Sequence, residues 1–391
     1  MKKAVLLVLD GVGIGEMPDA AEYGDSRSDT LGNTAKAVGG LILPNMQKLG
    51  LGNIHPIQGI DPVVSPAASW GKMAEKSKGK DSTTGHWEMM GLQSPVPMPT
   101  FPEGFPEEFI KGFSEATGHL ILANEVASGT EIIQRFGDEQ ILTAGLIVYT
   151  SADSVFQIAA HESAVPVAEL YRCCEIARKM LSSPELRVGR VIARPFSGET
   201  GKFERTSRRR DFSLTPPGHT LLDTFAAAGI PVSGVGKVDD LFDHRNIHTV
   251  HSGSNREAMD LLLNMNRASE GGFMFANFCD FDSKWGHRND YRGFAEGLAA
   301  VDEWIPSFLT SMNKGDVFVI TADHGNDPTT TSTDHSREFV PLLVFSPDCT
   351  GVPLGIRSAF SDIACSLADF FGVSNTFAGK SFINEVCSER K

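Results

Sequence analysis

Short apolar runs that end in acidic loops recur along the chain. Four examples are AVLLVLDG (4–11), GGFMFANFCDFD (271–282), DVFVITADHG (316–325) and PLLVFSPD (341–348). Runs this short and rich in Val, Ile and Phe are typical of strands buried on both faces of a parallel sheet. Helical patterns lie between them, as in residues 291–312 and 360–371. The alternation predicts an α/β fold whose central, mostly parallel sheet is flanked by helices.

Two proline-rich stretches interrupt this pattern. Residues 94–106 contain five prolines, and TPPGHT follows at 215–220. Proline at this density stops helices and produces extended connectors. The segment between the two stretches has strand and helix patterns of its own. We therefore predict a discontinuous core, residues 1–99 with 216–391, and a smaller inserted α+β domain, residues 100–215.

Acidic residues follow three of the predicted core strands, and histidines follow closely. In open α/β sheets, ligands bind beyond the carboxyl ends of the strands. Carboxylates and neutral imidazoles without thiolates suit Mn²⁺, Mg²⁺ or Zn²⁺. The set is too large for one ion and sufficient for two, an arrangement suited to phosphoryl displacement. The candidate residues are Asp10, Asp280, Asp282, His287, Asp323, His324, Asp334 and His335.

A run of hydroxyl residues supplies a candidate nucleophile. The segment GKDSTTGHWEMMG (79–91) contains Ser82, Thr83 and Thr84 in succession. A metal ion lowers the pKa of a bound hydroxyl, which makes the alkoxide a strong nucleophile. Alternatively, one of these hydroxyls caps the following helix. Both roles are compatible in one residue.

The glycines of DGVGIGEM (10–17) resemble a dinucleotide-binding fingerprint only superficially. If the GxGxxG motif begins at Gly11, Glu16 stands where the third glycine is required. If it begins at Gly13, Pro18 stands there. The acid also precedes the glycines, whereas the fingerprint places it about 20 residues later. We expect these glycines to let the backbone turn tightly beside a metal-bound Asp10.

Composition narrows the partners and the location. The formal charge is −14, from 49 acidic and 35 basic residues, which argues against nucleic acid or an anionic membrane as a partner. The N-terminal apolar run stops at Asp10, so we predict a first strand in place of a signal peptide. No apolar stretch is long enough to span a bilayer. The six cysteines include no CxxC pair and are expected to be reduced thiols. A cytoplasmic location follows as an expectation.

Motifs over essentially the whole chain resemble the alkaline phosphatase superfamily and, within it, the phosphopentomutase family. Two of them, TSADSVFQIAAHE and VGRVIARPF, lie in the predicted insertion and so speak for the narrower family. The others are LDGVGIGEMPDA, GKDSTTGHWEMMG, FPEGFP, NEVASGTEI, FCDFDSKWGHR and ITADHGNDPTTTSTDHSREFVPLL.

The resemblance implies two Mn²⁺ sites. One would use Asp282, His287 and His335; the other would use Asp10, Asp323, His324 and the nucleophile. Asp334 would then orient a neighbouring group or have no role. The family nucleophile is usually a threonine four positions before the motif histidine, and here that position is Ser82, counted from His86.

The resemblance also implies substrate contacts and an activator. In the insertion it points to Ser151, Asp153 and Val155 around the pentose and to Arg190 and Ile192; in the core it points to Lys237. Guanidinium and ammonium groups suit a phosphate. The arginines within Arg205–Arg210 fit either a solvated surface or a phosphate contact. Glucose 1,6-bisphosphate would prime the enzyme.

The implied activity interconverts (deoxy)ribose 1-phosphate and (deoxy)ribose 5-phosphate through phosphorylated Ser82 and a bisphosphate. The substrates would be small pentose phosphates. The alternatives are a metal-dependent phosphatase or phosphodiesterase with the same core, a phosphoglycerate mutase, and a non-catalytic binding protein. The inserted motifs count against the first two, and the complete ligand set counts against the third.

Overall fold

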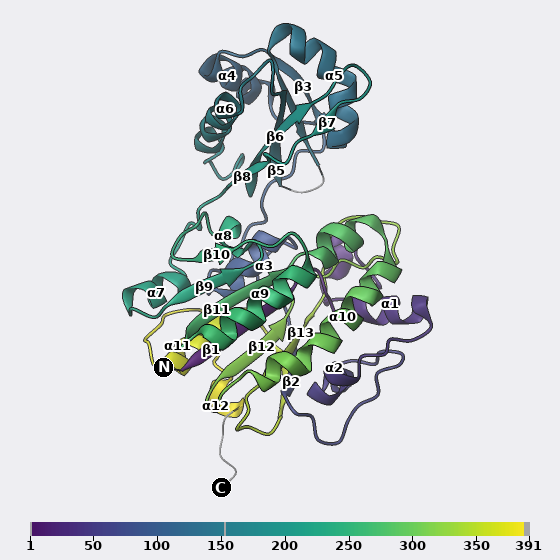
Figure 1. The fold of residues 1–391 in the computed structure, drawn as a ribbon, viewed down its shortest axis with the longest axis vertical. Helices are drawn as coiled ribbons and strands as arrows, with labels where there is room; N and C mark the ends of the chain where they lie inside the picture. Colours follow the sequence, from purple (N-terminus) through teal and green to yellow (C-terminus); the bar gives the residue numbers. More distant parts are fainter. Residues whose placement is uncertain (1, 152–153, 387–391) are drawn as a thin grey trace. The chain divides into compact units, whose positions relative to one another are not determined.

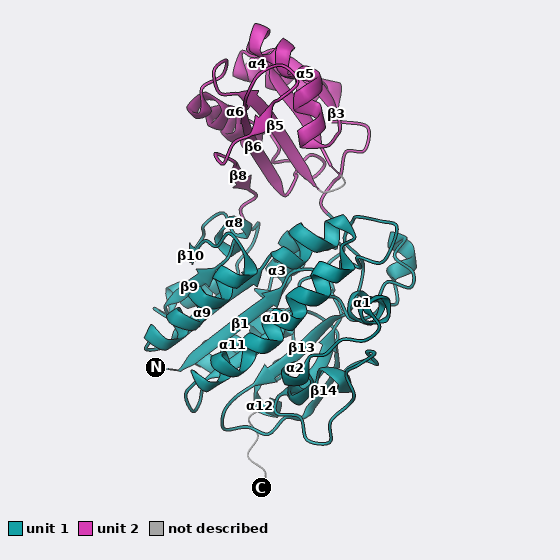
Figure 2. Cartoon of the chain, turned by 45° about the vertical axis from the view of Figure 1, so that its right-hand side comes forward, with its two compact units in different colours: residues 1–97, 216–391 teal, residues 98–215 magenta. Residues whose placement is uncertain are grey.

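The computed structural model describes residues 2–151 and 154–386. It divides into two compact units: residues 1–97 with 216–391, and residues 98–215 (Figure 2). The prediction that the smaller unit acts as a substrate-recognising cap is not tested by this division and stays a prediction. Among the described residues, no helix has the length and apolarity needed to cross a bilayer.

The larger unit is built on an eight-stranded sheet (Figure 1). Its central strands β9, β11, β1 and β12 are parallel to one another, and β13 runs antiparallel to both of its neighbours. The mostly parallel α/β core expected from the sequence is confirmed. In sheet order the strands are β10 (His248–Val250), β9 (Val232–Val235), β11 (Gly272–Phe278), β1 (Lys3–Leu9), β12 (Val317–Thr321), β13 (Val340–Phe345), β2 (Ser69–Met73) and β14 (Pro353–Arg357).

Helices cover both faces of this sheet. The first layer comprises α1 (Thr30–Val38), α2 (Pro44–Leu49), α9 (Asn255–Ala268) and α10 (Tyr291–Thr310), of which the first three each contact α10. The second comprises α3 (Ser82–Met89), α7 (Leu221–Ala227), α8 (Val238–Leu241), α11 (Asp362–Phe371) and α12 (Ile383–Val386). Strand β11 shows why both layers are needed: Phe275 stacks near His86 of α3, while Phe278 packs against Trp304 of α10. All seven residues of β11 are buried, which explains its continuous apolar sequence.

The smaller unit has a separate six-stranded sheet and two apolar cores. The strands are β3 (Ile121–Val126), β4 (Leu146–Thr150), β5 (Val155–His161), β6 (Arg190–Ser197) and β7 (Glu204–Arg205), with β8 (Arg210–Ser213) paired to β6. Helices α4 (Glu107–Thr117) and α6 (Val167–Met180) bury one face of this sheet. Helix α5 (Gly129–Thr143) buries the other.

Candidate metal centre and nucleophile

The carboxyl ends of three adjacent parallel strands bring the candidate ligands together. Asp10 follows β1, Asp323 and His324 follow β12, and Asp282 follows β11. Asp282 belongs to a single-turn π-helix, Phe281–Trp285, and His287 to the 3₁₀ turn after it. The loop between β12 and β13 carries His335 back to the same edge. Sheet order therefore gathers candidate ligands that are more than three hundred residues apart in sequence, from Asp10 to His335.

The first group of ligand atoms comprises Asp282, His287 and His335. His335 Nε2 lies 3.2 Å from Asp282 Oδ1, and His287 Nε2 lies 3.3 Å from Asp282 Oδ2. These are the three residues that the family resemblance assigns to one metal site.

The second group comprises Asp10, His324 and again Asp282. His324 Nε2 lies 3.3 Å from Asp10 Oδ1 and 3.4 Å from Asp323 Oδ2. Asp323 is therefore next to this second group, because its carboxylate lies beside His324. Asp282 is common to both groups, a shared role that the sequence did not suggest.

The donor set fits divalent metal ions. Asp323 Oδ2 and His335 Nε2 are buried and make no hydrogen bond among the described residues, although each is within ion-pair distance of one: Asp323 Oδ2 lies 3.2 Å from His86 Nδ1, and His335 Nε2 lies 3.2 Å from Asp282 Oδ1. His324 Nδ1 lies 3.1 Å from the Gly325 carbonyl, and His287 Nδ1 lies 2.7 Å from the Thr333 carbonyl. Because a carbonyl only accepts, each Nδ1 carries a proton, and Nε2 is the ring nitrogen left to face the acids, as in metal-binding histidines.

Burial and mutual charge shift the pKa values of the acids. Burial, followed by repulsion from Asp323 and Asp282, raises the pKa of Asp10. Burial alone would also raise the pKa of Asp282, but attraction to His335 and His287 outweighs it and lowers that pKa well below its usual value. Buried carboxylates this close together require compensating positive charge. Divalent ions would supply that charge.

Ser82 is the hydroxyl that faces this cluster. Its Oγ lies 3.1 Å from His324 Nε2 and donates to Asp10 Oδ1 at 3.4 Å. The expectation that a Ser or Thr hydroxyl caps helix α3 is wrong. The N-cap is Asp81, whose carboxylate accepts from the Thr84 N–H at 3.0 Å and from the Thr84 hydroxyl at 2.7 Å. Ser82 is the first helical residue, so its hydroxyl has no capping role.

Three side chains that the sequence did not single out as functional hold the ligands in place. Asn326 Nδ2 donates to Asp282 Oδ1 at 2.7 Å, and Asn277 Nδ2 donates to Asp10 Oδ2 at 2.8 Å. His86 Nδ1 lies 2.8 Å from the Ser82 carbonyl and 3.2 Å from Asp323 Oδ2. Of these three side chains, only His86 could have been found from the sequence. It follows Ser82 by four residues, and residues i and i+4 share one face of a helix.

Two candidate acids make other contacts. Asp334 accepts the His335 N–H at 2.8 Å and pairs with Lys80 Nζ at 3.3 Å. It therefore connects the loop between β12 and β13 to the segment that precedes Ser82. Asp280 accepts the Asn255 N–H at 2.9 Å at the start of α9. Neither acid is in either group of ligand atoms.

The expected substrate residues are divided between the units. Lys237 is exposed in the larger unit, at the carboxyl end of β9. In the smaller unit, Val155 and Arg190 are paired in register at one end of the sheet, where Ser151 follows β4 and Ile192 continues β6. Arg190 pairs with Asp211 at 3.7 Å. Asp153 lies outside the described residues.

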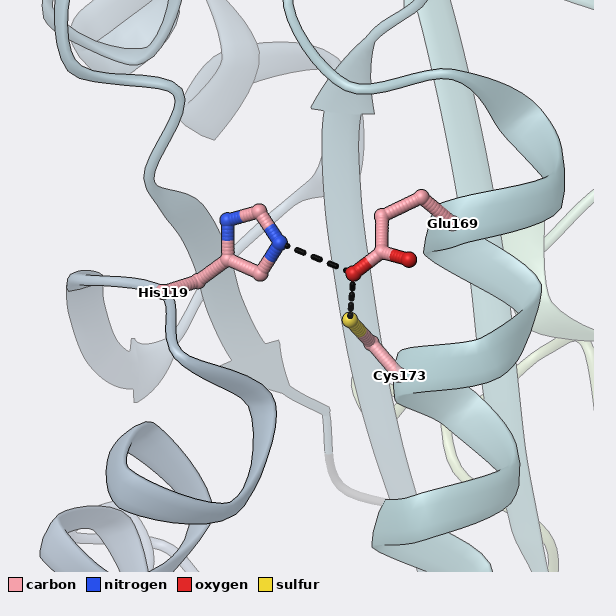
Figure 3. Close-up of side chains that lie close together, drawn as sticks. All are labelled: His119, Glu169 and Cys173. Atoms are coloured by element: carbon pink, nitrogen blue, oxygen red, sulfur yellow. Dashed lines mark hydrogen bonds and ion pairs between the residues drawn. The ribbon is translucent and has the colours of Figure 1, made fainter.

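A His–Glu–Cys cluster in the smaller unit shows how similar residue types are satisfied without a metal. Glu169 Oε1 lies 3.1 Å from His119 Nε2 and accepts from Cys173 Sγ at 3.7 Å (Figure 3). Arg172 donates to both Glu169 oxygens, and this hydrogen bonding lowers the pKa of Glu169 to about 2. Burial raises the pKa of Cys173 to about 12, so the thiol stays protonated. Arg172 therefore already binds both oxygens of the Glu169 carboxylate that a metal ion would need as a ligand.

Comparison with known proteins agrees with the geometry. The family model for the metalloenzyme superfamily matches residues 2–375. The phosphopentomutase of Desulfitobacterium hafniense is 53% identical over 99% of this chain and 100% of the relative. That of Dictyoglomus thermophilum is also 53% identical, over 99% of both chains. The solved PH0037 protein from Pyrococcus horikoshii, 16% identical, covers 97% of this chain and 99% of its own with a TM-score of 0.50, a similarity of fold alone.

A sheet edge that gathers candidate metal ligands and half-identical relatives that match nearly end to end thus point the same way: this chain belongs to the phosphopentomutase family of the metalloenzyme superfamily.

Proposed function

We propose that the chain interconverts the 1-phosphate and 5-phosphate of ribose or deoxyribose through a phosphorylated Ser82 and a pentose bisphosphate. Family membership makes the chain an enzyme of the phosphomutase type and implies that it binds a divalent metal. The observation that carries the proposed mechanism is the Ser82 hydroxyl, 3.1 Å from His324 Nε2 and within reach of Asp10.

Asp10, Asp323, His324 and Ser82 would hold one Mn²⁺, and Asp282, His287 and His335 would hold the other. Bound there, the ions would lower the pKa of the Ser82 hydroxyl and neutralise charge on the transferring phosphoryl group. His86 orients both the Ser82 backbone and Asp323. The N-terminus of α3 directs its partial positive charge at any phosphate on Ser82.

The reaction comprises two phosphoryl transfers. The P–O bond of phospho-Ser82 breaks as a free hydroxyl of the pentose monophosphate attacks phosphorus, and the proton of that hydroxyl passes to the released Ser82 oxygen. The bisphosphate then turns round, and Ser82 takes the other phosphoryl group. Glucose 1,6-bisphosphate would prime Ser82 in the first cycle. Ser151, Asp153, Val155, Arg190, Ile192 and Lys237 would bind the sugar phosphate.

The nearest alternative is a metal-dependent phosphatase, in which water takes the phosphoryl group. The two functions differ in their products. With Mn²⁺ and the primer, we expect ribose 1-phosphate to become ribose 5-phosphate with little inorganic phosphate released, followed by ³¹P NMR. Predominant release of inorganic phosphate would favour the phosphatase. Peptide mapping of the primed protein should place the phosphate on Ser82; phosphate on Thr84 would contradict the assignment.

A further inference from the structure

Two acids and two histidines come together beside β9 and β10, the outermost strands at one side of the large sheet. Asp239 and Asp240 lie in the short helix α8 that follows β9. His251 directly follows β10, and His244 lies in the turn between α8 and β10. One ligand atom from each of Asp239, Asp240 and His251 lies within 4.8 Å of the others. None of these residues belongs to the two ligand groups described above.

The nitrogen–oxygen distances in this cluster resemble those of the candidate metal centre. His251 Nε2 lies 2.9 Å from Asp239 Oδ1, and His244 Nδ1 lies 3.1 Å from Asp239 Oδ2. At the candidate metal centre the corresponding distances are 3.2–3.4 Å. A divalent ion with bonds of about 2.0–2.2 Å holds neighbouring ligand atoms about 3–3.5 Å apart. The side chains are therefore already spaced to receive an ion.

The Asp239 carboxylate is buried without a permanently charged partner. Asp239 is only 5% exposed. It contacts the two imidazoles and accepts the Asp240 N–H at 3.1 Å, and no lysine or arginine of the described chain forms an ion pair with it. A buried carboxylate requires compensating positive charge. In the His–Glu–Cys cluster of the smaller unit Arg172 supplies that charge, whereas a metal ion can supply it here.

The turn that carries His244 holds this histidine against Asp239. The His244 backbone N–H donates to the Asp239 carbonyl at 2.9 Å, while the ring contacts the carboxylate. Asp243, His244 and Asn246 have φ values of 52°, 58° and 57°, in the left-handed region that residues with a β-carbon adopt at a cost. His244 thus fixes one oxygen of Asp239, as neighbouring side chains do for metal-bound carboxylates. The other oxygen, on which His251 converges, is left for an ion.

We propose that Asp239, Asp240 and His251 form a further metal site, which takes a divalent transition-metal ion such as Zn²⁺ and joins α8 to the end of β10. An imidazole beside carboxylates favours zinc over magnesium or calcium. In the metal-free chain His251 Nε2 must carry a proton to hydrogen-bond to the Asp239 carboxylate. On metal binding that proton passes to solvent, and the nitrogen lone pair binds the ion. The His251 side chain is 50% exposed, so the ion reaches the site from solvent.

The role of such an ion would be structural, because it would cross-link two segments that are otherwise joined by a turn. Lys237 immediately precedes α8, so the ion would also fix the backbone beside a residue that we expect to bind the sugar phosphate. Only this consequence rests on the proposed function. Metal binding itself involves neither Ser82 nor the ligands around it.

The test counts the zinc bound per full-length chain by equilibrium dialysis against a zinc buffer at micromolar free Zn²⁺, with atomic emission as the readout. We expect His251→Gln to bind one zinc ion fewer than the parent. The matched control is His248→Gln, which replaces an exposed histidine of β10 and should bind as the parent does. Zinc at the other candidate ligands is common to all three chains, so the difference reports this site alone. Both histidines are exposed, so neither change removes a buried side chain.

A second measurement locates the ion in the parent chain. Diethyl pyrocarbonate modifies free imidazole nitrogens, and peptide mass spectrometry reads the modified residue. Zn²⁺ should protect His251 and leave His248 reactive, and Mg²⁺ at the same concentration should protect neither. Equal zinc counts in the parent and His251→Gln would overturn the site. Equal losses in both variants would also overturn it, since they indicate non-specific surface binding. Zinc binding that depends on His251 supports the site whether or not the chain converts pentose phosphates.

Discussion

Single side chains next to the candidate metal centre divide into those that touch a ligand and those that only support its loop. Asn326 touches Asp282 directly and is itself held, because its backbone N–H donates to the Thr30 hydroxyl at 3.1 Å. The Asp334 carboxylate, by contrast, accepts the backbone N–H of His335 and pairs with the Lys80 ammonium. Loss of these two contacts should therefore have unequal consequences.

For Asn326 we predict a defect in metal binding. Asn326→Ala removes the donor that orients Asp282, and loss of such a partner typically lowers metal affinity about 10–100-fold. Competition with a chelating indicator measures Mn²⁺ affinity without reference to turnover. The matched control is Asn313→Ala at an exposed site; if both variants bind Mn²⁺ as the parent does, Asn326 does not position Asp282.

For the Asp334–His335 pair we predict a strong asymmetry in activity. Asp334→Asn keeps an acceptor for the His335 N–H and weakens a partly exposed ion pair, which contributes about 0–1 kcal/mol, so less than about a fivefold loss is expected. His335→Asn removes a proposed metal ligand and should cost far more. Initial rates at saturating Mn²⁺ compare the two, and equal losses would mean that Asp334 has a direct role.

At the scale of elements, the approach of α3 to the end of β12 positions the nucleophile. A β-carbon on Gly85 would collide with the Asp323 carbonyl oxygen, so this helix packs directly on the end of β12 that carries the candidate ligands. Gly112 in α4 offers a comparison, since its β-carbon would meet only the end of the Met180 side chain, at 3.5 Å.

We therefore predict opposite effects for two helical Gly→Ala changes. Gly85→Ala should destabilise the chain by about 1–3 kcal/mol through overpacking and should reduce activity by displacing Ser82. Gly112→Ala should be neutral or stabilising by up to about 1 kcal/mol, because alanine favours helix. Urea unfolding measures both; a harmless Gly85→Ala would show that the helix can withdraw without cost.

Glu338 joins three segments near the centre and makes the stability depend on pH. Its carboxylate accepts from the N–H groups of Gly15 and Thr30 and from the hydroxyls of Thr30 and Ser336, at 2.7–3.2 Å. Burial nevertheless raises its pKa from 4.5 to about 8. The folded chain therefore holds this proton over a pH range in which the unfolded chain releases it.

The sign of the effect follows from that difference. Between pH 4.5 and about 8 the folded state binds the extra proton, so Glu338 makes the free energy of unfolding fall as pH rises through this window. The slope from one group is at most about 1.4 kcal/mol per pH unit. Glu338→Gln should flatten the dependence measured by urea unfolding, whereas Glu303→Gln, at an exposed site, should not. An unchanged slope in Glu338→Gln would show that Glu338 is ionised throughout.

At the scale of the whole molecule, the candidate metal centre would couple ion binding to folding of the larger unit. Asp10, Asp282 and Asp323 are all buried and come from three strands, so they converge only in the folded chain. Ions that bind only the folded state stabilise it by mass action.

We therefore expect Mn²⁺ to raise the melting temperature of the chain. At 100 times the dissociation constant, one site contributes about 2.7 kcal/mol, and a chelator should reverse the gain. Scanning calorimetry with and without Mn²⁺ measures the shift. His335→Asn should reduce it; a shift that is identical in His335→Asn would place the ion elsewhere.

The sequence by itself determined the core fold and the chemical types at its edge. Short apolar runs, alternating helices and strand-ending acids are local features, and local pattern is enough to predict a parallel sheet and where its ligands lie. The Asp10, Asp323 and His324 positions follow from that reasoning. The sequence offers three candidate nucleophiles, Ser82, Thr83 and Thr84. Only the family resemblance, through the spacing from His86, selects Ser82 among them.

Only the tertiary structure decided which of several similar residues meet. It directs Asp280 to helix α9 and Asp282 to both ligand groups, assigns the cap of α3 to Asp81, and leaves Arg205 without the partners that Arg208 and Arg209 have. It also brings Asn326 to Asp282, forty-four residues away. Which residues contact one another depends on the order of the strands in the sheet and on close packing between segments that are distant in sequence. The linear sequence specifies neither the sheet order nor this packing. Residues of the same type and spacing acquire different neighbours only in the folded chain.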